Sequence, residues 1–188
     1  MSENLIILLI NCLFAIYFML PAYISNLCGL AFGGGKPLDM YKTFSDGNRL
    51  IGNGVTWRGL ISGTIIGTII GGIIGYVGLN IPELTGNIIL INLPTTITSG
   101  LIFGFLLAIG ALIGDAVGSF IKRRLGLESG APAPLLDQLD FVFGAIIFIS
   151  PIIQLNIPII LLICIISIIF HLLSNTIAYL IGIKDVWY

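Results

Sequence analysis

Long apolar stretches with almost no charge dominate this sequence and constrain its fold more than any other feature. They cover residues 5–27, 59–79, 96–117 and 141–183, and the only charged residue within them is Asp115. A helix needs about 20 apolar residues to cross the hydrocarbon core of a bilayer. Only 9% of the 188 residues are charged, whereas soluble domains average about 25%. The chain is therefore predicted to fold in a membrane.

The last of these stretches is too long for one helix. It is interrupted by Pro151 and by the polar segment 154–158, so we divide it in two. The prediction is an all-α integral membrane protein, a single domain over residues 1–188. Its five transmembrane helices are predicted at about 5–27, 59–79, 96–117, 135–153 and 158–181. Residues 84–93 are apolar but too short to span, and we expect them to be interfacial or re-entrant.

Positive charge is confined to one side of this topology. All eight Lys and Arg residues fall in the loops 28–58 and 118–134 and their edges, or in the C-terminal tail. Short loops rich in Lys and Arg face the cytoplasm. Both loops and the C-terminus are therefore predicted to be cytoplasmic and the N-terminus to be outside. The net charge of −1 gives no reason to expect nucleic acid as a partner.

Glycines recur at four-residue spacing in the second predicted helix, from Gly59 to Gly75, and in two shorter runs in the third. Such spacing places small residues along one helix face and lets another backbone approach closely. Tight packing between helices is the favoured interpretation. The alternatives are a homodimer formed through these glycine-rich faces and a groove for a lipid chain.

Acidic and basic side chains meet at the inner end of the third predicted helix. On a continued helix, Asp115, Ser119 and Lys122 share one face, and an acid at this depth costs a few kcal/mol unless it has a partner. Asp137 and Asp140 share a face at the start of the fourth helix. Acids there can simply complement the helix dipole. With Asp115, however, they can also provide oxygen ligands for Mg²⁺, which bridges substrate phosphates.

Two other regions are weaker candidates. The loop 28–58 contains three consecutive glycines but no Walker A motif. Its Arg49 and Thr56 are candidate contacts for phosphate or base, unless the loop only meets anionic headgroups. His171 and Asn175 lie one helical turn apart in the last helix. There they are either part of a hydrogen-bond ladder between helices or lining residues of a pocket.

Residues 114–124 (GDAVGSFIKRR), followed by 134–140 (PLLDQLD), resemble the signature of the CDP-archaeol synthase family. That family is the archaeal relative of the CDP-diacylglycerol synthases. Parts of the first helix and loop, including the segment 56–59 (TWRG), and His171, Asn175 and Tyr179 also match. Two sites depart from the pattern: Val55 stands where a lysine is expected, and Cys28 and Gly29 stand where a proline is expected shortly after Asn26.

The resemblance implies Mg²⁺-dependent transfer of a cytidylyl group from CTP to an unsaturated isoprenoid ether lipid phosphate, 2,3-di-O-geranylgeranylglyceryl phosphate. The products would be CDP-archaeol and pyrophosphate. It also implies a multi-pass protein of the cell membrane with a cytoplasmic active site. The roles that follow are metal ligation by Asp115, Asp137 and Asp140, and CTP phosphate binding by Ser119, Lys122 and Arg123, with Arg49 and Thr56 as weaker nucleotide contacts.

Three other interpretations stay open at this point. One is a CDP-diacylglycerol synthase acting on ester phosphatidate, since apolar grooves recognise lipid tails by shape. A second, from another functional class, is a small ion-coupled or proton-coupled transporter that uses Asp115 and His171. A third is a glycine-rich scaffold without catalysis, which leaves the convergence of acids and bases unexplained.

Overall fold

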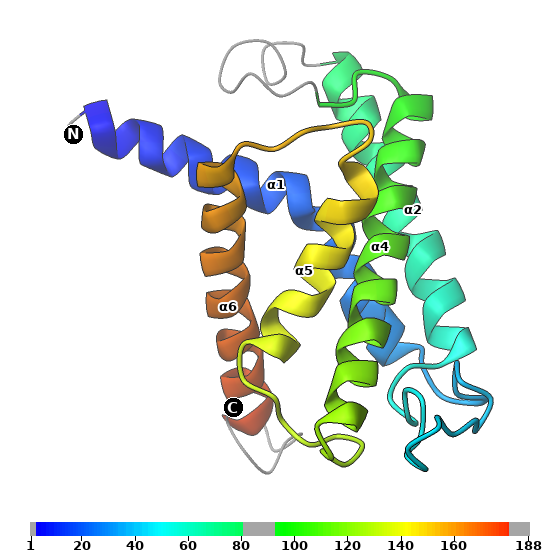
Figure 1. Ribbon diagram of the computed structural model, residues 1–188. Coiled ribbons are helices and arrows are strands. Elements are labelled where there is room, and N and C mark those ends of the chain that lie inside the picture. The colour runs from blue at the N-terminus through cyan, green and yellow to red at the C-terminus, as the bar shows by residue number, and fades with distance from the viewer. Residues whose placement is uncertain (1–2, 81–92, 181–188) are drawn as a thin grey trace.

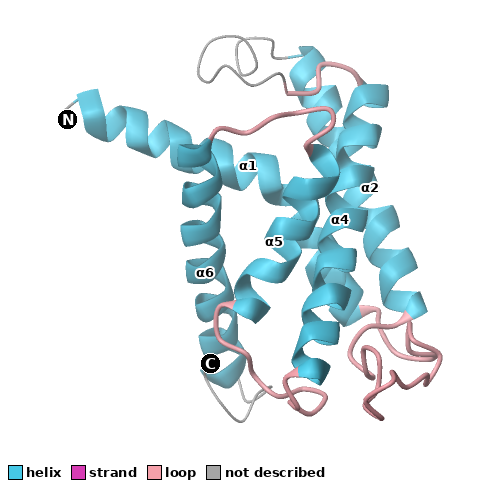
Figure 2. Ribbon diagram, viewed as in Figure 1, coloured by secondary structure: helices cyan, strands magenta, loops and turns pink. Residues whose placement is uncertain are grey.

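The computed structural model describes residues 3–80 and 93–180, and within them the protein is helical (Figures 1 and 2). The helices are α1 (Glu3–Ala31), α2 (Trp57–Asn80), α4 (Ile97–Arg124), α5 (Leu136–Ile149) and α6 (Ile157–Leu180). Only two isolated β-bridges, both in the loop between α1 and α2, interrupt this pattern among the described residues. The all-α prediction is confirmed.

Four of these helices, α1, α2, α4 and α6, are long and apolar enough to cross a membrane. The fourth predicted span differs: 135–153 was expected to be helical, but α5 has only 14 residues. At 1.5 Å per residue it is about 21 Å long, which is short of the roughly 30 Å hydrocarbon core. Pro134 was expected in the first turn of this helix but lies before it. Most of the segment 84–93 lies outside the described residues.

Polar residues fix where several helices begin. Thr56 precedes α2, and its Oγ1 accepts a hydrogen bond from the Gly59 amide at 3.1 Å. Thr96 caps α4 through a reciprocal pair of bonds with Ser99. Asn156 caps α6 by accepting from the Ile159 amide at 3.0 Å, and Pro158 lies in the first turn as predicted. Such side chains satisfy amides that have no partner within the helix.

The glycine faces of α2 and α4 pack against other helices of the same chain. Gly71 lies against the backbone of Gly100 and Gly104, and Gly67 meets the Ala108 side chain. On its other side, α4 places Gly110 and its neighbours against α5. The prediction of tight helix packing is therefore confirmed. Contacts within the same chain occupy these faces, and a homodimer formed through them stays a prediction.

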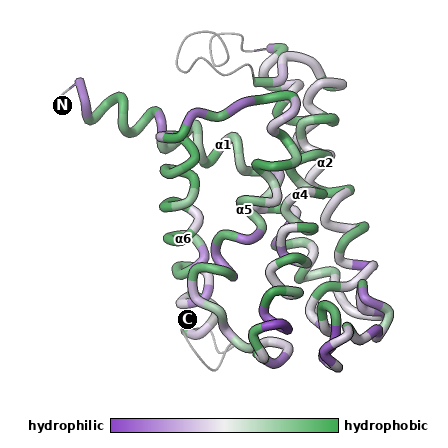
Figure 3. The backbone as a smooth tube through the Cα atoms, viewed as in Figure 1, coloured by the Kyte–Doolittle hydropathy of each residue, from purple (hydrophilic) through white to green (hydrophobic). Residues whose placement is uncertain are grey.

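Charged residues gather where α4 ends and α5 begins, at the same end as the loop between α1 and α2 (Figure 3). The other end, where α2 ends and α4 begins, carries no Lys or Arg among the described residues, although the connection between α5 and α6 is partly hydrophilic there (Figure 3). Between them lies a core that includes Phe18, Met19, Leu107, Val142 and Ile163. The fold therefore carries its polar chemistry at one end of a helical bundle.

Candidate active site

A cleft of about 990 Å³ opens at this charged end, bounded by α1, α4, α5, α6 and the loop before α2. Five of the residues predicted to form the site line it: Thr56, Asp115, Lys122, Asp137 and Asp140. His171 and Asn175 of α6 line it as well, which supports the pocket-lining interpretation of that pair. Residues more than 100 positions apart in the sequence thus meet at one place.

Lys122 and Asp137 form the central ion pair of the cleft. The Lys122 Nζ donates to the Asp137 Oδ1 at 2.7 Å, and both side chains are largely shielded from solvent. The Ala133 amide donates to the other oxygen of Asp137 at 2.8 Å. The last turn of α4 and the segment before α5 are therefore held together at the wall of the cleft.

Asp140 and Asp115 complete the acidic side of the cleft. The Phe141 amide donates to the Asp140 Oδ1 at 2.6 Å, and the other side of the Asp140 carboxylate lies against Gly118 of α4. Asp115 is partly buried in α4, one helical turn before Gly118. Electrostatic interactions connect Asp115 with Asp137, Asp140 and Lys122. Three carboxylates thus repel one another in a confined space, with one lysine to offset them.

Such a donor set fits a hard divalent cation. In the described part of the chain, no group of three His, Cys, Asp or Glu side chains is arranged to hold a metal by itself. Mg²⁺ does not need one, because it binds through one or two carboxylates and takes its other ligands from water and substrate phosphates. A cation would also relieve the repulsion between Asp115 and Asp140.

Three other predicted residues do not line the cleft. Ser119 lies on α4 outside its lining. Arg123 is buried, and its Nε finds no hydrogen-bond partner among the described residues. Arg49 binds Asp39 instead, through bonds of 2.7 and 3.2 Å. The structure therefore brings the acids, Lys122 and Thr56 together but leaves the predicted arginines outside.

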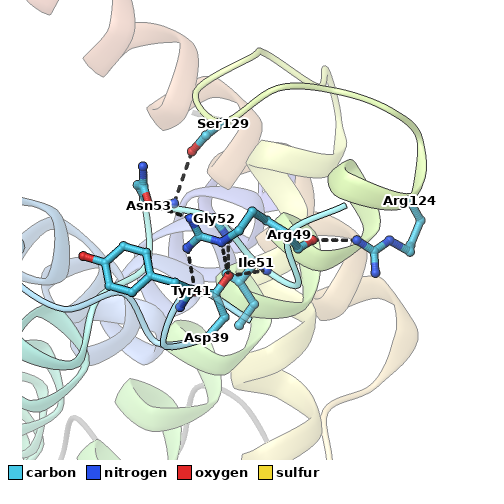
Figure 4. A network of polar contacts seen from close by, with 8 residues as sticks. All are labelled: Asp39, Tyr41, Arg49, Ile51, Gly52, Asn53, Arg124 and Ser129. Atoms are coloured by element: carbon cyan, nitrogen blue, oxygen red, sulfur yellow. Dashed lines mark hydrogen bonds and ion pairs between the residues drawn. The ribbon is translucent and has the colours of Figure 1, made fainter. Parts of the chain in front are cut away.

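Asp39 organises the loop before α2 (Figure 4). Its carboxylate is fully buried and accepts from Arg49 and from the amides of Tyr41, Ile51 and Gly52. Burial by itself would raise the pKa of Asp39, but the bonds from Arg49 and these amides outweigh it and hold the pKa well below its usual range. Asp39 in turn raises the pKa of Arg49. This network supports the backbone that continues to Thr56.

Arg124 connects this loop to α4. Its Nε lies 3.0 Å from the Asp46 carboxylate, it donates to the Arg49 carbonyl at 2.6 Å, and its guanidinium stacks on Phe44 and Phe120. Neither Arg124 nor Asp39 was assigned a role from the sequence. A signal that could have found Asp39 is that it lies in the same loop as Arg49, where an acid and a base can pair.

Comparison with known proteins shows the family of this chain. Residues 6–188 match the family model "CarS-like: CDP-archaeol synthase". The CDP-archaeol synthase of Methanothermobacter thermautotrophicus is 56% identical over 183 residues, which cover 97% of this chain and 98% of that protein. The CDP-archaeol synthase of Methanocaldococcus jannaschii is 49% identical over 178 residues, covering 93% and 96%.

A solved structure of an intramembrane enzyme for archaeal membrane lipids biosynthesis has the same fold. It superimposes with a TM-score of 0.71 at 37% sequence identity, over 86% of this chain and 92% of that one. This chain belongs to the CarS-like CDP-archaeol synthase family.

Proposed function

We propose that this protein transfers a cytidylyl group from CTP to 2,3-di-O-geranylgeranylglyceryl phosphate, forming CDP-archaeol and pyrophosphate. The observation that carries the proposal is the cleft in which Asp115, Asp137 and Asp140 surround Lys122. Membership of a CDP-archaeol synthase family supports the choice of CTP and an archaeal ether lipid.

The reaction needs positioning and charge neutralisation more than an enzyme nucleophile. A phosphate oxygen of the lipid attacks the α-phosphorus of CTP, a new P–O bond forms, and the bond to the β-phosphate oxygen breaks to release pyrophosphate. Both reactants are anions, so they repel each other until positive charge offsets them. Lys122 lies at the wall of the cleft with its ammonium group fixed by Asp137, and we assign it to the CTP phosphates.

Asp115, Asp137 and Asp140 would hold Mg²⁺ in this cleft. The ion supplies neutralisation of phosphate charge and a template for in-line displacement. The Phe141 amide and the close contact with Gly118 fix the orientation of the Asp140 carboxylate. Thr56 caps α2 at the cleft and remains a candidate nucleotide contact. Ser119, Arg123 and Arg49 are weaker candidates, because reaching the substrate would require them to leave their present surroundings.

For the membrane topology we propose five crossings, with the N-terminus outside and the cleft at the cytoplasmic face. Alternating helix directions support it, since α1 and α4 end at the charged end while α2 and α5 begin there (Figure 1). The short α5 counts as a crossing only if the bilayer thins around it or the residues after it also lie within the membrane. At the cytoplasmic face, CTP arrives from water and the lipid phosphate from the bilayer.

Two alternative functions are less well supported. The cleft wall formed by Leu172, Leu173 and Phe170 is apolar and would accept an ester phosphatidate by shape alone; the family membership favours the ether lipid. A transporter would need ionisable groups along a path across the membrane. Instead, Asp115, Asp137 and Asp140 all line the one cleft.

The test is incorporation of labelled CTP by the purified protein in lipid vesicles. Ether-linked and ester-linked lipid phosphates are compared at equal concentration, each with Mg²⁺ and with a chelator. We expect labelled lipid with the ether substrate and Mg²⁺, and at least about tenfold less with the ester, which corresponds to 1.4 kcal/mol of discrimination. Equal incorporation from both lipids would contradict the assigned substrate but not the cytidylyl transfer.

A further inference from the structure

A second groove, of about 550 Å³, lies between α4 and the loop before α2. It is separate from the cleft of the candidate active site, because the groove and the cleft open on different faces of α4. The cleft is lined by Leu112, Asp115 and Lys122, whereas the groove is lined by Ile113, Val117 and other residues of the adjoining face. At 100° per residue, the centres of these faces are about 140° apart around the helix.

The walls of the groove are largely apolar. Ala116 is buried, and its small side chain leaves room between Val117 and Trp57, which are 51% and 42% exposed. Ile113 and Val117 belong to a helix long and apolar enough to cross the membrane. Exposed apolar side chains of such a helix face lipid, and tryptophan is enriched at the level of the headgroups. The groove therefore faces the bilayer near its surface.

One cation stands at the rim. Two backbone hydrogen bonds fix Lys42. Its amide donates to the Asp39 carbonyl at 2.9 Å, and its carbonyl accepts from the Leu50 amide at 3.0 Å. Its side chain is exposed and forms no ion pair with any residue that the structure describes. Asp39 also borders the groove, but its carboxylate is fully buried against Arg49. The exposed charge at this groove is therefore positive.

We propose that this groove binds an anionic membrane lipid, with its apolar chain against Ile113 and Val117 and its phosphate at Lys42. An apolar groove beside a helix, with an exposed lysine at headgroup depth, is complementary to such a molecule in both shape and charge. The site is distinct from the substrate cleft and does not depend on the proposed reaction. Its effect is to hold the loop before α2 against the membrane surface.

The experiment uses Trp57 as a local reporter. Trp187 is the other tryptophan of the sequence, so the full-length Trp187→Phe variant has Trp57 as its only tryptophan. This protein is reconstituted in phosphatidylcholine vesicles that contain either brominated phosphatidylglycerol or brominated phosphatidylcholine at equal mole fraction. Bromine quenches tryptophan fluorescence only at close range. We expect the anionic lipid to compete for the Trp57 site about fivefold better, as one lysine near a lipid surface implies.

Two substitutions separate a specific site from diffuse attraction. Lys42→Gln should abolish the preference for anionic lipid, and Lys42→Arg should retain it. Lys36→Gln is the matched control, because Lys36 is an exposed lysine of the same loop that does not line the groove, so the preference should persist. Equal quenching by both lipids in the parent protein, or the same loss from Lys36→Gln as from Lys42→Gln, would overturn the proposal.

Discussion

The Asp140 carboxylate of α5 packs directly against Gly118 of α4, with no room for a side chain between them. A Cβ atom at position 118 would overlap the Asp140 side chain, lying within 2.8 Å of its Cβ and Cγ. Glycine here serves the candidate active site as well as helix packing. It lets an acid from one helix stand beside Asp115 and Lys122 of the other.

We predict that Gly118→Ala displaces Asp140 and reduces activity at least about a hundredfold, because a shift of about 1 Å in a catalytic group costs this much. Cytidylyl transfer measures the effect, and thermal unfolding separates it from loss of the fold. The control is Gly72→Ala, where the nearest atom is the end of the flexible Leu101 side chain, 2.9 Å away. Full activity in Gly118→Ala would show that the position of Asp140 is unimportant.

Replacing Lys122 should impair the reaction by two routes. Lys122→Met removes a positive charge from the cleft and leaves the Asp137 carboxylate with the Ala133 amide as its only partner among the described residues. We expect kcat/KM for CTP to fall about 10²- to 10³-fold, as when one donor to a developing negative charge is lost. Lys36→Met is the charge-matched control, because Lys36 is exposed and lines neither the cleft nor the second groove. A similar loss in both variants would argue against a specific role for Lys122.

The loop before α2 should loosen in acid because of Asp39. Its pKa in the folded protein lies below the ordinary value of about 3.9. Its contribution to stability is therefore complete above that value and is lost as the pH falls through the lower, folded pKa. Hydrogen exchange at Ile51 and Gly52, corrected for intrinsic rates, should show protection that declines below about pH 4. In Asp39→Asn it should be weak throughout, whereas protection independent of pH in the parent would contradict this role.

Gly71→Val should destabilise the fold strongly, because a side chain at Gly71 meets the backbone of Gly100 and Gly104. Backbone cannot move aside as a flexible side chain can, so α2 and α4 would have to separate. We expect a thermal midpoint lower by many degrees, with Gly72→Ala within a few degrees of the parent. Equal midpoints for the two variants would show that this contact does not hold the helices together.

Helix composition and spacing predicted much of the fold. Runs of apolar residues located the membrane helices, and four-residue glycine spacing predicted their close packing. The fourth helix was predicted too long, because it was extended past Pro151, whereas α5 ends at Ile149, two residues before that proline. Within the site, Asp137 and Asp140 were found because their i, i+3 spacing places them on one face, and the structure brings both to Lys122.

The arginines were harder to place from sequence. Arg49 was expected near the nucleotide, but the buried Asp39, ten residues earlier, holds it in the loop. Arg124 likewise binds Asp46 and stacks on two aromatic rings. Spacing along one segment does not reveal such partners, because they come from folding of an irregular loop and from a helix 75 residues away.

The central claim is that the three acids and Lys122 form a cytidylyltransferase site, and release of pyrophosphate from CTP tests it most directly. The parent protein should release pyrophosphate only when Mg²⁺ and the ether lipid phosphate are both present. Asp137→Asn and Asp140→Asn should lose nearly all of this release while remaining folded. Normal turnover by both variants, or release that does not require the lipid phosphate, would contradict the account.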